Sequence, residues 1–151
     1  MNLILFGFKG SGKTHFGKLV SQKLGRRFID TDRLIEEELG QNIRSIYAAV
    51  GEKRFRRIEK KIIARLTPGY AVIALGGGAI FASLSFLRKI GKLIYLRISL
   101  ETVQKRVTSV PFSLQNTYKK RLPRYDAIQA HRIDIEGLSE EKIVEEIIGA
   151  L

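Results

Sequence analysis

A phosphate-binding loop is the clearest chemical feature of this 151-residue chain. Residues 7–14 read Gly-Phe-Lys-Gly-Ser-Gly-Lys-Thr, the complete G-x-x-x-x-G-K-[ST] pattern. Glycines in such a loop let backbone N–H groups approach phosphate oxygens without a Cβ in the way. We expect Lys13 to reach the outer phosphates and the Thr14 hydroxyl to ligate a magnesium ion. The residues expected to bind a nucleotide here are Gly10, Ser11, Gly12, Lys13 and Thr14.

Two aspartates form a second candidate group. Asp30 and Asp32 stand at the end of the apolar run 27–30. One carboxylate there can organise the shell of a magnesium ion, and the other can bind a hydroxyl that attacks the terminal phosphate. The alternative for either residue is helix capping, because aspartate is favoured just before a helix. Given the phosphate loop upstream, the pair favours catalysis.

Three consecutive glycines and one arginine complete the candidate residues. Gly76, Gly77 and Gly78 follow the apolar run 70–75 and permit a ligand to approach the backbone, although a loose turn is the alternative. Arg56 stands three residues before a glutamate on a predicted helix, so the two can pair. A guanidinium held in this way suits an acidic substrate. Without further context an ordinary surface ion pair is the favoured interpretation.

The elements that must position these residues alternate along the chain. Apolar runs predict five strands, at residues 2–6, 27–30, 71–75, 93–98 and 132–135. Helical patterns cover residues 14–24, 33–39, 52–66, 81–90, 101–107 and 140–148, with glycines at several boundaries. Such alternation predicts an α/β fold with a parallel sheet covered on both faces. The segment 109–117 lacks periodicity and is the best candidate for a mobile loop.

The phosphate loop, the aspartate pair and the triple glycine each follow a predicted strand. In an open parallel sheet, ligands bind beyond the carboxyl ends of the strands. The three groups are therefore expected to converge on one site, and this convergence is stronger evidence than any one of them.

Composition indicates one domain, residues 1–151, without a membrane span and without a secretory or transit segment, so we expect a cytoplasmic protein. There is no cysteine for a disulfide or thiolate metal site. The net charge of +12 would suit a nucleic-acid binder or a pocket for anions. The densest basic cluster lies on a predicted helix and lacks the interleaved aromatic residues that stack on bases. Nucleic acid is therefore not expected as a partner.

Taken together, five segments resemble the shikimate kinase family. They are residues 7–14, 28–32, 51–59, 76–78 and 120–125. The resemblance implies a five-stranded parallel sheet of the nucleoside monophosphate kinase type, with a substrate-binding region at about 31–60 and a lid at about 107–119. It also implies transfer of the ATP γ-phosphate to the 3-hydroxyl of shikimate, a step towards chorismate and the aromatic amino acids.

The resemblance assigns a role to each candidate residue. Asp32 would bind ring hydroxyls and take the proton of the attacking one, and Asp30 would organise magnesium through water. Lys13, Asp30 and Asp32 are thus the expected catalytic residues. Arg106 resembles the arginine that stacks on adenine, and would bind ATP. The implied substrate-binding residues, including two arginines that would clamp the shikimate carboxylate, are Asp32, Arg56, Gly76, Gly77, Gly78 and Arg121.

The lid departs from the family pattern. Val110 precedes Pro111 where the family has an arginine that touches the transferring phosphate, and the lid is several residues shorter. Lys105, Arg106 or Lys119 could supply the missing charge. Two alternatives to a shikimate kinase stay open: a kinase of another sugar acid such as gluconate, or a non-catalytic relative that binds nucleotide or nucleic acid. A monomer is expected.

Overall fold

All five predicted strands are present in the computed structural model, which describes residues 1–106 and 112–151. They are β1 (Asn2–Phe6), β2 (Arg27–Asp30), β3 (Ala71–Ala74), β4 (Gly91–Arg97) and β5 (His131–Asp134). They form one sheet in which every pairing is parallel and the order is β2-β3-β1-β4-β5. The predicted α/β fold is confirmed. The order places the carboxyl ends of β2, β3 and β1 side by side.

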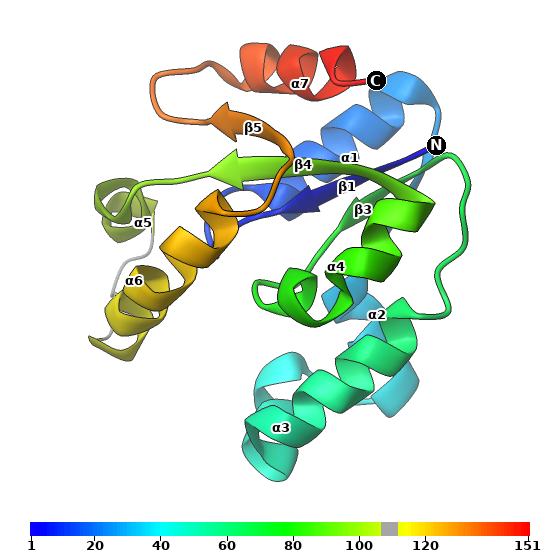
Figure 1. Cartoon of the computed structure of the whole chain (residues 1–151), viewed down its shortest axis with the longest axis vertical. Helices are drawn as coiled ribbons and strands as arrows, with labels where there is room; N and C mark the ends of the chain where they lie inside the picture. The colour runs from blue at the N-terminus through cyan, green and yellow to red at the C-terminus, as the bar shows by residue number, and fades with distance from the viewer. Residues whose placement is uncertain (107–111) are drawn as a thin grey trace.

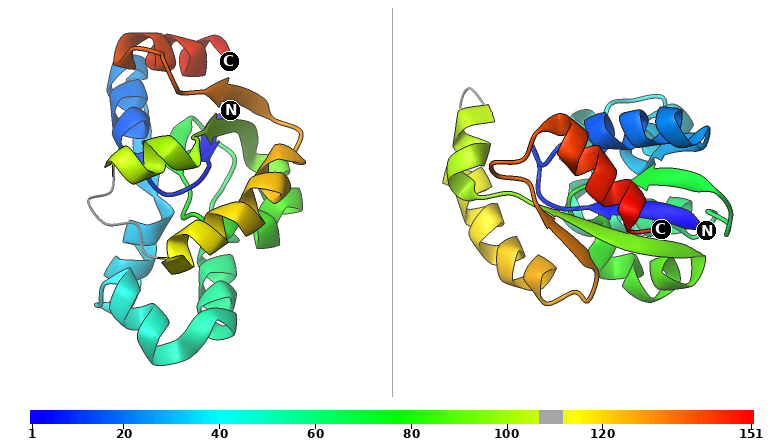
Figure 2. Two further views of the ribbon diagram at one scale, coloured as in Figure 1. Left: turned by 90° about the vertical axis from the view of Figure 1, so that its left-hand side faces the viewer. Right: turned by 90° about the horizontal axis from the view of Figure 1, so that it is seen from above.

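Helices cover both faces of the sheet (Figure 1). Helices α1 (Lys13–Leu24) and α7 (Glu140–Gly149) pack together on one face, and α4 (Ala79–Ile90) lies across the other. Helices α5 (Leu100–Arg106) and α6 (Phe112–Asp126) follow β4 and lead to β5. Figure 2 shows the same two layers from the side and from above. No helix in the described ranges is long and apolar enough to cross a membrane.

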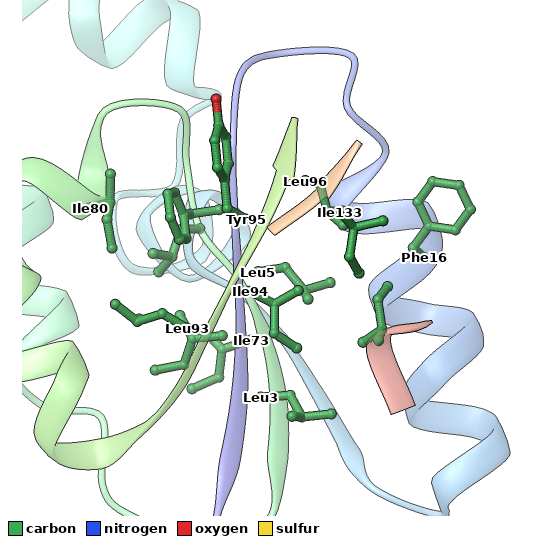
Figure 3. Close-up of a cluster of buried hydrophobic side chains, with 14 of the residues drawn as sticks. Leu3, Leu5, Phe16, Ile73, Ile80, Leu93, Ile94, Tyr95, Leu96 and Ile133 are labelled. Carbon is green, nitrogen blue, oxygen red and sulfur yellow. The ribbon is translucent and has the colours of Figure 1, made fainter. Parts of the chain in front are cut away.

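The hydrophobic core lies on both faces of the sheet. Strand β1 is buried along its whole length, and its neighbours β3 and β4 are almost as apolar. Figure 3 shows Ile80 and Leu93 on the α4 side of the sheet, with Phe16 and Ile133 on the α1 side. Both faces therefore exclude water, as the continuous apolar runs of a parallel sheet require. This rigid centre holds the site residues at the ends of its strands.

A helical hairpin projects from the sheet (Figure 1) and carries its own small core. It consists of α2 (Thr31–Leu39) and α3 (Ile43–Ile63), and α3 begins well before the predicted start at residue 52. Gly51 interrupts α3 with φ 78° and ψ 171°, so two helical segments meet at a kink. The predicted helix 52–66 therefore corresponds to the second of these segments. The kink turns the second segment, with Arg56, back towards the sheet.

The prediction of a loop at 109–117 was wrong for residues 112–117, which belong to α6. Residues 109–111 lie outside the described part of the chain. The helix has no continuous apolar stripe, and few of its side chains are buried. Two of these are Tyr118 and Tyr125, whose hydroxyls donate to the carbonyls of Ile98 and Gly77. Such hydrogen bonds to distant parts of the chain hold the helix without a regular apolar pattern, so the sequence does not show a helical periodicity here.

Candidate active site

The phosphate-binding loop joins the carboxyl end of β1 to α1, as predicted. Gly7, Gly10 and Gly12 have φ angles of 150°, 86° and 90°, which residues with a Cβ rarely adopt. Gly12 is the N-cap of α1, and no described side chain caps this helix. The first N–H groups of α1 therefore remain available to an anion, which the helix dipole also favours.

Lys13 begins α1 and folds back over the loop. Its Nζ donates to the carbonyl oxygens of Gly7 at 2.7 Å and Phe8 at 3.2 Å. Burial lowers the pKa of Lys13 to about 8, while the nearby carboxylates of Asp32 and Asp30 act in the opposite direction. The ammonium group is still mostly protonated at pH 7, so it can bind a phosphate.

Asp30 uses its two oxygens for different purposes. Oδ1 caps α2, accepting from the backbone N–H groups of Asp32 at 3.0 Å and Arg33 at 3.3 Å. Oδ2 accepts a hydrogen bond from the Thr14 hydroxyl at 2.9 Å. The capping alternative and the predicted position beside Thr14 are thus both correct for Asp30.

The Thr14–Asp30 pair fits a magnesium ion. Hard oxygen donors are what magnesium prefers, and the ion usually keeps several waters and shares phosphate oxygens. Within the described residues, no cluster of three or more His, Cys, Asp or Glu side chains offers a metal site of its own. Thr14 and Asp30 would therefore hold such an ion only together with oxygens that the bound nucleotide and water supply.

Asp32 lies between the phosphate loop and the triple glycine. Burial raises the pKa of its carboxyl group to about 6, and the negative charges of Asp30 and Glu59 act in the same direction, while Lys13 opposes them. Asp32 lines a cavity of about 560 Å³, together with Lys13, Thr14, Gly76 and other residues of the loop. The carboxylate thus faces the phosphate-binding side of the cavity and is still largely ionised at pH 7.

Side chains of the predicted site lie against all three glycines of the triple glycine. A Cβ on Gly76 would collide with Oδ1 of Asp32, and one on Gly77 would lie 2.9 Å from Nη1 of Arg121. A Cβ on Gly78 would lie 2.5 Å from Nη2 of the Arg56 guanidinium. Each glycine therefore meets a different predicted site residue. Residues 77–78 form a turn, and the approach of a ligand to this backbone stays a prediction.

The backbone of this segment also leaves donors unused. The N–H of Gly76 donates to the Thr31 hydroxyl at 3.0 Å, and its carbonyl accepts from Ala79 at 3.1 Å. The N–H groups of Gly77 and Gly78 have no hydrogen-bond partner within the described chain. These two donors precede the N-terminus of α4, so they favour a ligand oxygen.

Arg56 does not form an ordinary surface ion pair. Its Nη1 donates to Oε1 of Glu59 at 2.7 Å, and the exposed fractions of the two side chains are 24% and 2%. Burial raises the pKa of Glu59, although the Arg56 charge and hydrogen bond oppose this effect. The surface alternative is therefore wrong, because the glutamate is buried and holds the guanidinium beside Gly78.

Arg121 and Arg106 reach the site from helices after β4. Arg121, on α6, lines the same cavity as Lys13 and Asp32 and lies against Gly77. Arg106, at the end of α5, donates from Nη1 to the carbonyl oxygen of Gly10 at 2.8 Å. Arg106 is thus next to the phosphate loop, whereas its predicted contact with adenine stays a prediction.

The predicted lid lies partly outside the described residues. This holds for Val110 and Pro111, where the family pattern has an arginine before the proline. Of the three cations that could replace that arginine, Lys105 pairs with Glu101 at 3.1 Å on the surface. Arg106 is the one that contacts the loop.

Sequence reasoning missed two features of the site. Glu59 was considered only as the partner of Arg56, whereas its Oε2 is buried without a hydrogen-bond partner among the described atoms and faces Gly76. Tyr125 was noted only as part of a matching segment, whereas its hydroxyl contacts the Gly77 carbonyl. A tyrosine four residues after Arg121 was the available signal, since such residues share a helix face.

The phosphate loop, the partly buried Asp32 carboxylate and the Arg121 guanidinium line one cavity, and Arg121 also lines a second cavity with Arg56 and Gly78. This combination is typical of a small-molecule kinase of the phosphate-loop class. The model of the shikimate kinase family matches residues 9–151. The chain is 38% identical to a shikimate kinase of Thermodesulfovibrio yellowstonii, over 97% of this chain and 92% of that protein. It is 36% identical to a shikimate kinase of Moorella thermoacetica, over 99% and 94%. The chain belongs to the shikimate kinase family.

Solved structures agree with this assignment. The shikimate kinase of Acinetobacter baumannii in complex with shikimate superposes with a TM-score of 0.87 and 30% identity, over 97% of this chain and 90% of that one. A gluconokinase of Sinorhizobium meliloti has a TM-score of 0.72 at 22% identity, over 99% and 90%. The gluconokinase therefore shares the fold alone. The phosphate-loop kinase fold expected from the sequence is confirmed.

Proposed function

We propose that this chain transfers the γ-phosphoryl group of ATP to the 3-hydroxyl of shikimate, giving shikimate 3-phosphate and ADP. One observation carries the proposal: three successive glycines pack against a base and two cations, in the pairs Gly76–Asp32, Gly77–Arg121 and Gly78–Arg56. Two unused backbone N–H groups lie between these side chains. The arrangement suits a small substrate that carries both hydroxyl groups and a carboxylate.

Asp32 is the proposed general base. It accepts the proton of the substrate hydroxyl as that oxygen attacks the γ-phosphorus. A new O–P bond forms, and the bond from the γ-phosphorus to the β–γ bridging oxygen breaks, which releases ADP. A pKa of about 6 leaves most of the carboxylate ionised at pH 7 yet close to the pH at which a base is most effective.

The phosphate loop binds and stabilises the transferring group. Lys13 moves from the loop carbonyls to the outer phosphates, and the N–H groups at the start of α1 bind phosphate oxygens. Thr14, and Asp30 through water, would hold a magnesium ion, which would supply positive charge against the phosphate oxygens. Arg106 is placed beside Gly10, from where we propose that it contacts the adenine of ATP.

Two guanidinium groups are proposed to hold the acid. Arg56 and Arg121 bind the shikimate carboxylate, and Glu59 fixes the Arg56 guanidinium through the 2.7 Å hydrogen bond. The N–H groups of Gly77 and Gly78 donate to oxygens of the substrate. A planar guanidinium that is already oriented loses little entropy on binding a carboxylate, so this side of the cavity selects for an acid.

The direct test measures ADP release from ATP and magnesium, with and without shikimate, and with gluconate as the control acid. Strong release that depends on shikimate alone supports the proposal and means that the shorter lid suffices. Release that gluconate stimulates equally well contradicts the assignment of the substrate. ATP binding without any stimulation contradicts the kinase itself and favours a non-catalytic nucleotide-binding relative.

Three further expectations belong to this proposal: a monomer, a cytoplasmic location and no nucleic-acid partner despite the charge of +12. Sedimentation tests the first, and localisation of a tagged chain tests the second. Binding to a random oligonucleotide at several salt concentrations tests the third, because non-specific binding through phosphates weakens steeply as salt rises.

A further inference from the structure

Tyr125 connects α6 to the triple glycine. The residue is 1% exposed, and it follows Arg121 by one helical turn, so the two side chains leave the same face of α6. Its hydroxyl donates a hydrogen bond to the carbonyl of Gly77. The position of a Cβ on Gly77 lies 2.9 Å from Arg121 Nη1 and 3.9 Å from the Tyr125 hydroxyl. Both side chains therefore pack on this one glycine.

The hydrogen bond to Gly77 determines the direction of the next donor. The carbonyl of Gly77 and the N–H of Gly78 belong to one planar trans peptide group, so they point in opposite directions. Because the carbonyl faces the Tyr125 hydroxyl, the N–H of Gly78 points away from it. This N–H has no hydrogen-bond partner within the described chain, so it remains available to a ligand.

Local structure alone would not hold this peptide. It lies between two glycines, whose φ and ψ angles can change at little steric cost. The peptide groups on either side are linked to each other, since the Gly76 carbonyl accepts from the N–H of Ala79 at 3.1 Å and so closes a turn around the Gly77–Gly78 peptide. The central peptide of such a turn can adopt opposite orientations, as in type I and type II turns. The Tyr125 hydroxyl donates to the Gly77 carbonyl. Without it, the peptide between Gly77 and Gly78 can rotate.

Packing keeps the hydroxyl in place. The ring of Tyr125 stacks on Phe81 at a centroid distance of 5.0 Å and contacts Tyr95 at 5.7 Å and Phe6 at 6.1 Å. Burial raises the pKa of Tyr125, although the charge of Arg121 and a hydrogen bond with its side chain oppose this effect. The hydroxyl therefore keeps its proton, and so its capacity to donate, near neutral pH.

We propose that Tyr125 is a positioning residue for the acid substrate: its hydroxyl holds the Gly77–Gly78 peptide so that the Gly78 N–H stays available to the substrate. The inference rests on the proposed function, because it takes this N–H as a ligand of shikimate. Tyr125 does not touch the substrate: it acts through the peptide, and its hydroxyl also lies beside Arg121. The Gly78 amide signal in nuclear magnetic resonance separates these two effects, because a change at Arg121 alone does not rotate the peptide. Tyr125 should therefore influence binding of the acid and leave the binding of ATP unchanged.

The test replaces Tyr125 with phenylalanine, which keeps the ring and removes the hydroxyl. The KM for shikimate should rise about fivefold to tenfold, the effect of one ordinary hydrogen bond, while kcat and the KM for ATP change little. Tyr118→Phe is the matched control. Tyr118 is also buried on α6 and donates to a carbonyl, that of Ile98 at 2.7 Å. This variant loses the same kind of bond away from the glycines, so its KM for shikimate should not change.

Two further measurements separate positioning from general loss of structure. Nuclear magnetic resonance of the Gly78 amide should show exchange broadening or a shifted signal in Tyr125→Phe and not in Tyr118→Phe. This readout needs no turnover. A variant with 4-aminophenylalanine at position 125 regains a donor, and should restore the KM for shikimate towards the original value.

An unchanged KM for shikimate in Tyr125→Phe overturns the inference, as does an equal rise in Tyr118→Phe. Failure of the 4-amino group to restore binding would show that the donor is not what matters. If the unaltered chain shows no turnover with shikimate, the proposed function fails. The Gly78 amide signal then still decides whether Tyr125 holds the peptide.

Discussion

Replacing Asp32 with asparagine should abolish turnover and yet stabilise the folded protein near neutral pH. The carboxyl group is partly withdrawn from water and lies near Asp30 and Glu59. Burial is the largest cause that raises its pKa from 3.8 to about 6, and the two neighbouring carboxylates add to the effect. An ionised Asp32 therefore costs folding free energy, whereas an amide of the same shape carries no charge to bury.

The size of the effect follows from the pKa. A pKa that rises from 3.8 to about 6 corresponds to about 3 kcal/mol between the two protonation states. This is an upper value, because asparagine must also find partners for its amide, so we expect a gain of about 1–3 kcal/mol. The folded state holds the proton more tightly than the unfolded chain. The cost is therefore absent below about pH 4, grows as pH rises, and is complete above about pH 6.

The assay is urea unfolding of both proteins at about pH 7.5 and about pH 4, with ADP release measured in parallel. Asp126→Asn is the control with the opposite sign. Burial alone would raise the pKa of Asp126, but hydrogen bonds from Arg97 and Tyr95 lower it. Removing that charge should destabilise the protein at neutral pH.

Two results would refute the reasoning about Asp32. One is an asparagine variant that is less stable than the original chain at about pH 7.5. The other is a stability difference that stays the same at both pH values, since a cost that comes from an ionised carboxylate must disappear when the carboxylate is protonated. Full turnover in the variant would remove Asp32 from the mechanism.

Three more predictions concern steady-state kinetics. Because Asp32 must be ionised, kcat/KM for shikimate should fall about tenfold per pH unit below about pH 6. A pH profile in which kcat/KM begins to fall only near pH 4 would contradict the raised pKa of Asp32. Arg56→Ala should weaken the binding of shikimate by about 2–5 kcal/mol, whereas Arg57→Ala, at the exposed neighbouring position, should leave it unchanged. A change in ATP binding alone would show that Arg56 does not bind the carboxylate. Gly76→Ala should displace Asp32 and lower kcat by about tenfold or more. Gly149→Ala is the control, because no atom lies within 4 Å of its Cβ position, and its kcat should equal that of the original chain. Equal kcat values for the two variants would show that the site tolerates the methyl group.

The nucleotide side of the site could be predicted because its determinants are local. One strand, one glycine-rich turn and one helix start place Lys13 and Thr14, and all are adjacent in sequence. The two interpretations of Asp30 are compatible with each other. Its Oδ1 caps α2 and its Oδ2 accepts from Thr14, so helix capping does not exclude a role near magnesium, which stays a prediction.

The environment of Arg56 could not be predicted from spacing alone. A pair three residues apart occurs on the surface of many helices, and its charges say nothing about burial. Burial of Glu59 depends on the kink at Gly51 and on the approach of the triple glycine, which are features of the folded chain. The resemblance to the family did indicate Arg56 as a substrate-binding residue, because the pattern of residues in a family reflects how they pack in the folded chain.

The two sides of the site therefore depend on different contacts. The acid side combines α3, the segment before α4, and α6, and the Tyr125 bond to Gly77 spans 48 residues. Contacts of that range are formed only when the sheet has brought the segments together. A substitution that loosens the packing of α6 should thus weaken the binding of the acid substrate more than it weakens the binding of ATP. Selectivity for the acid then depends on how firmly Tyr125 and its aromatic neighbours hold α6 against the glycines.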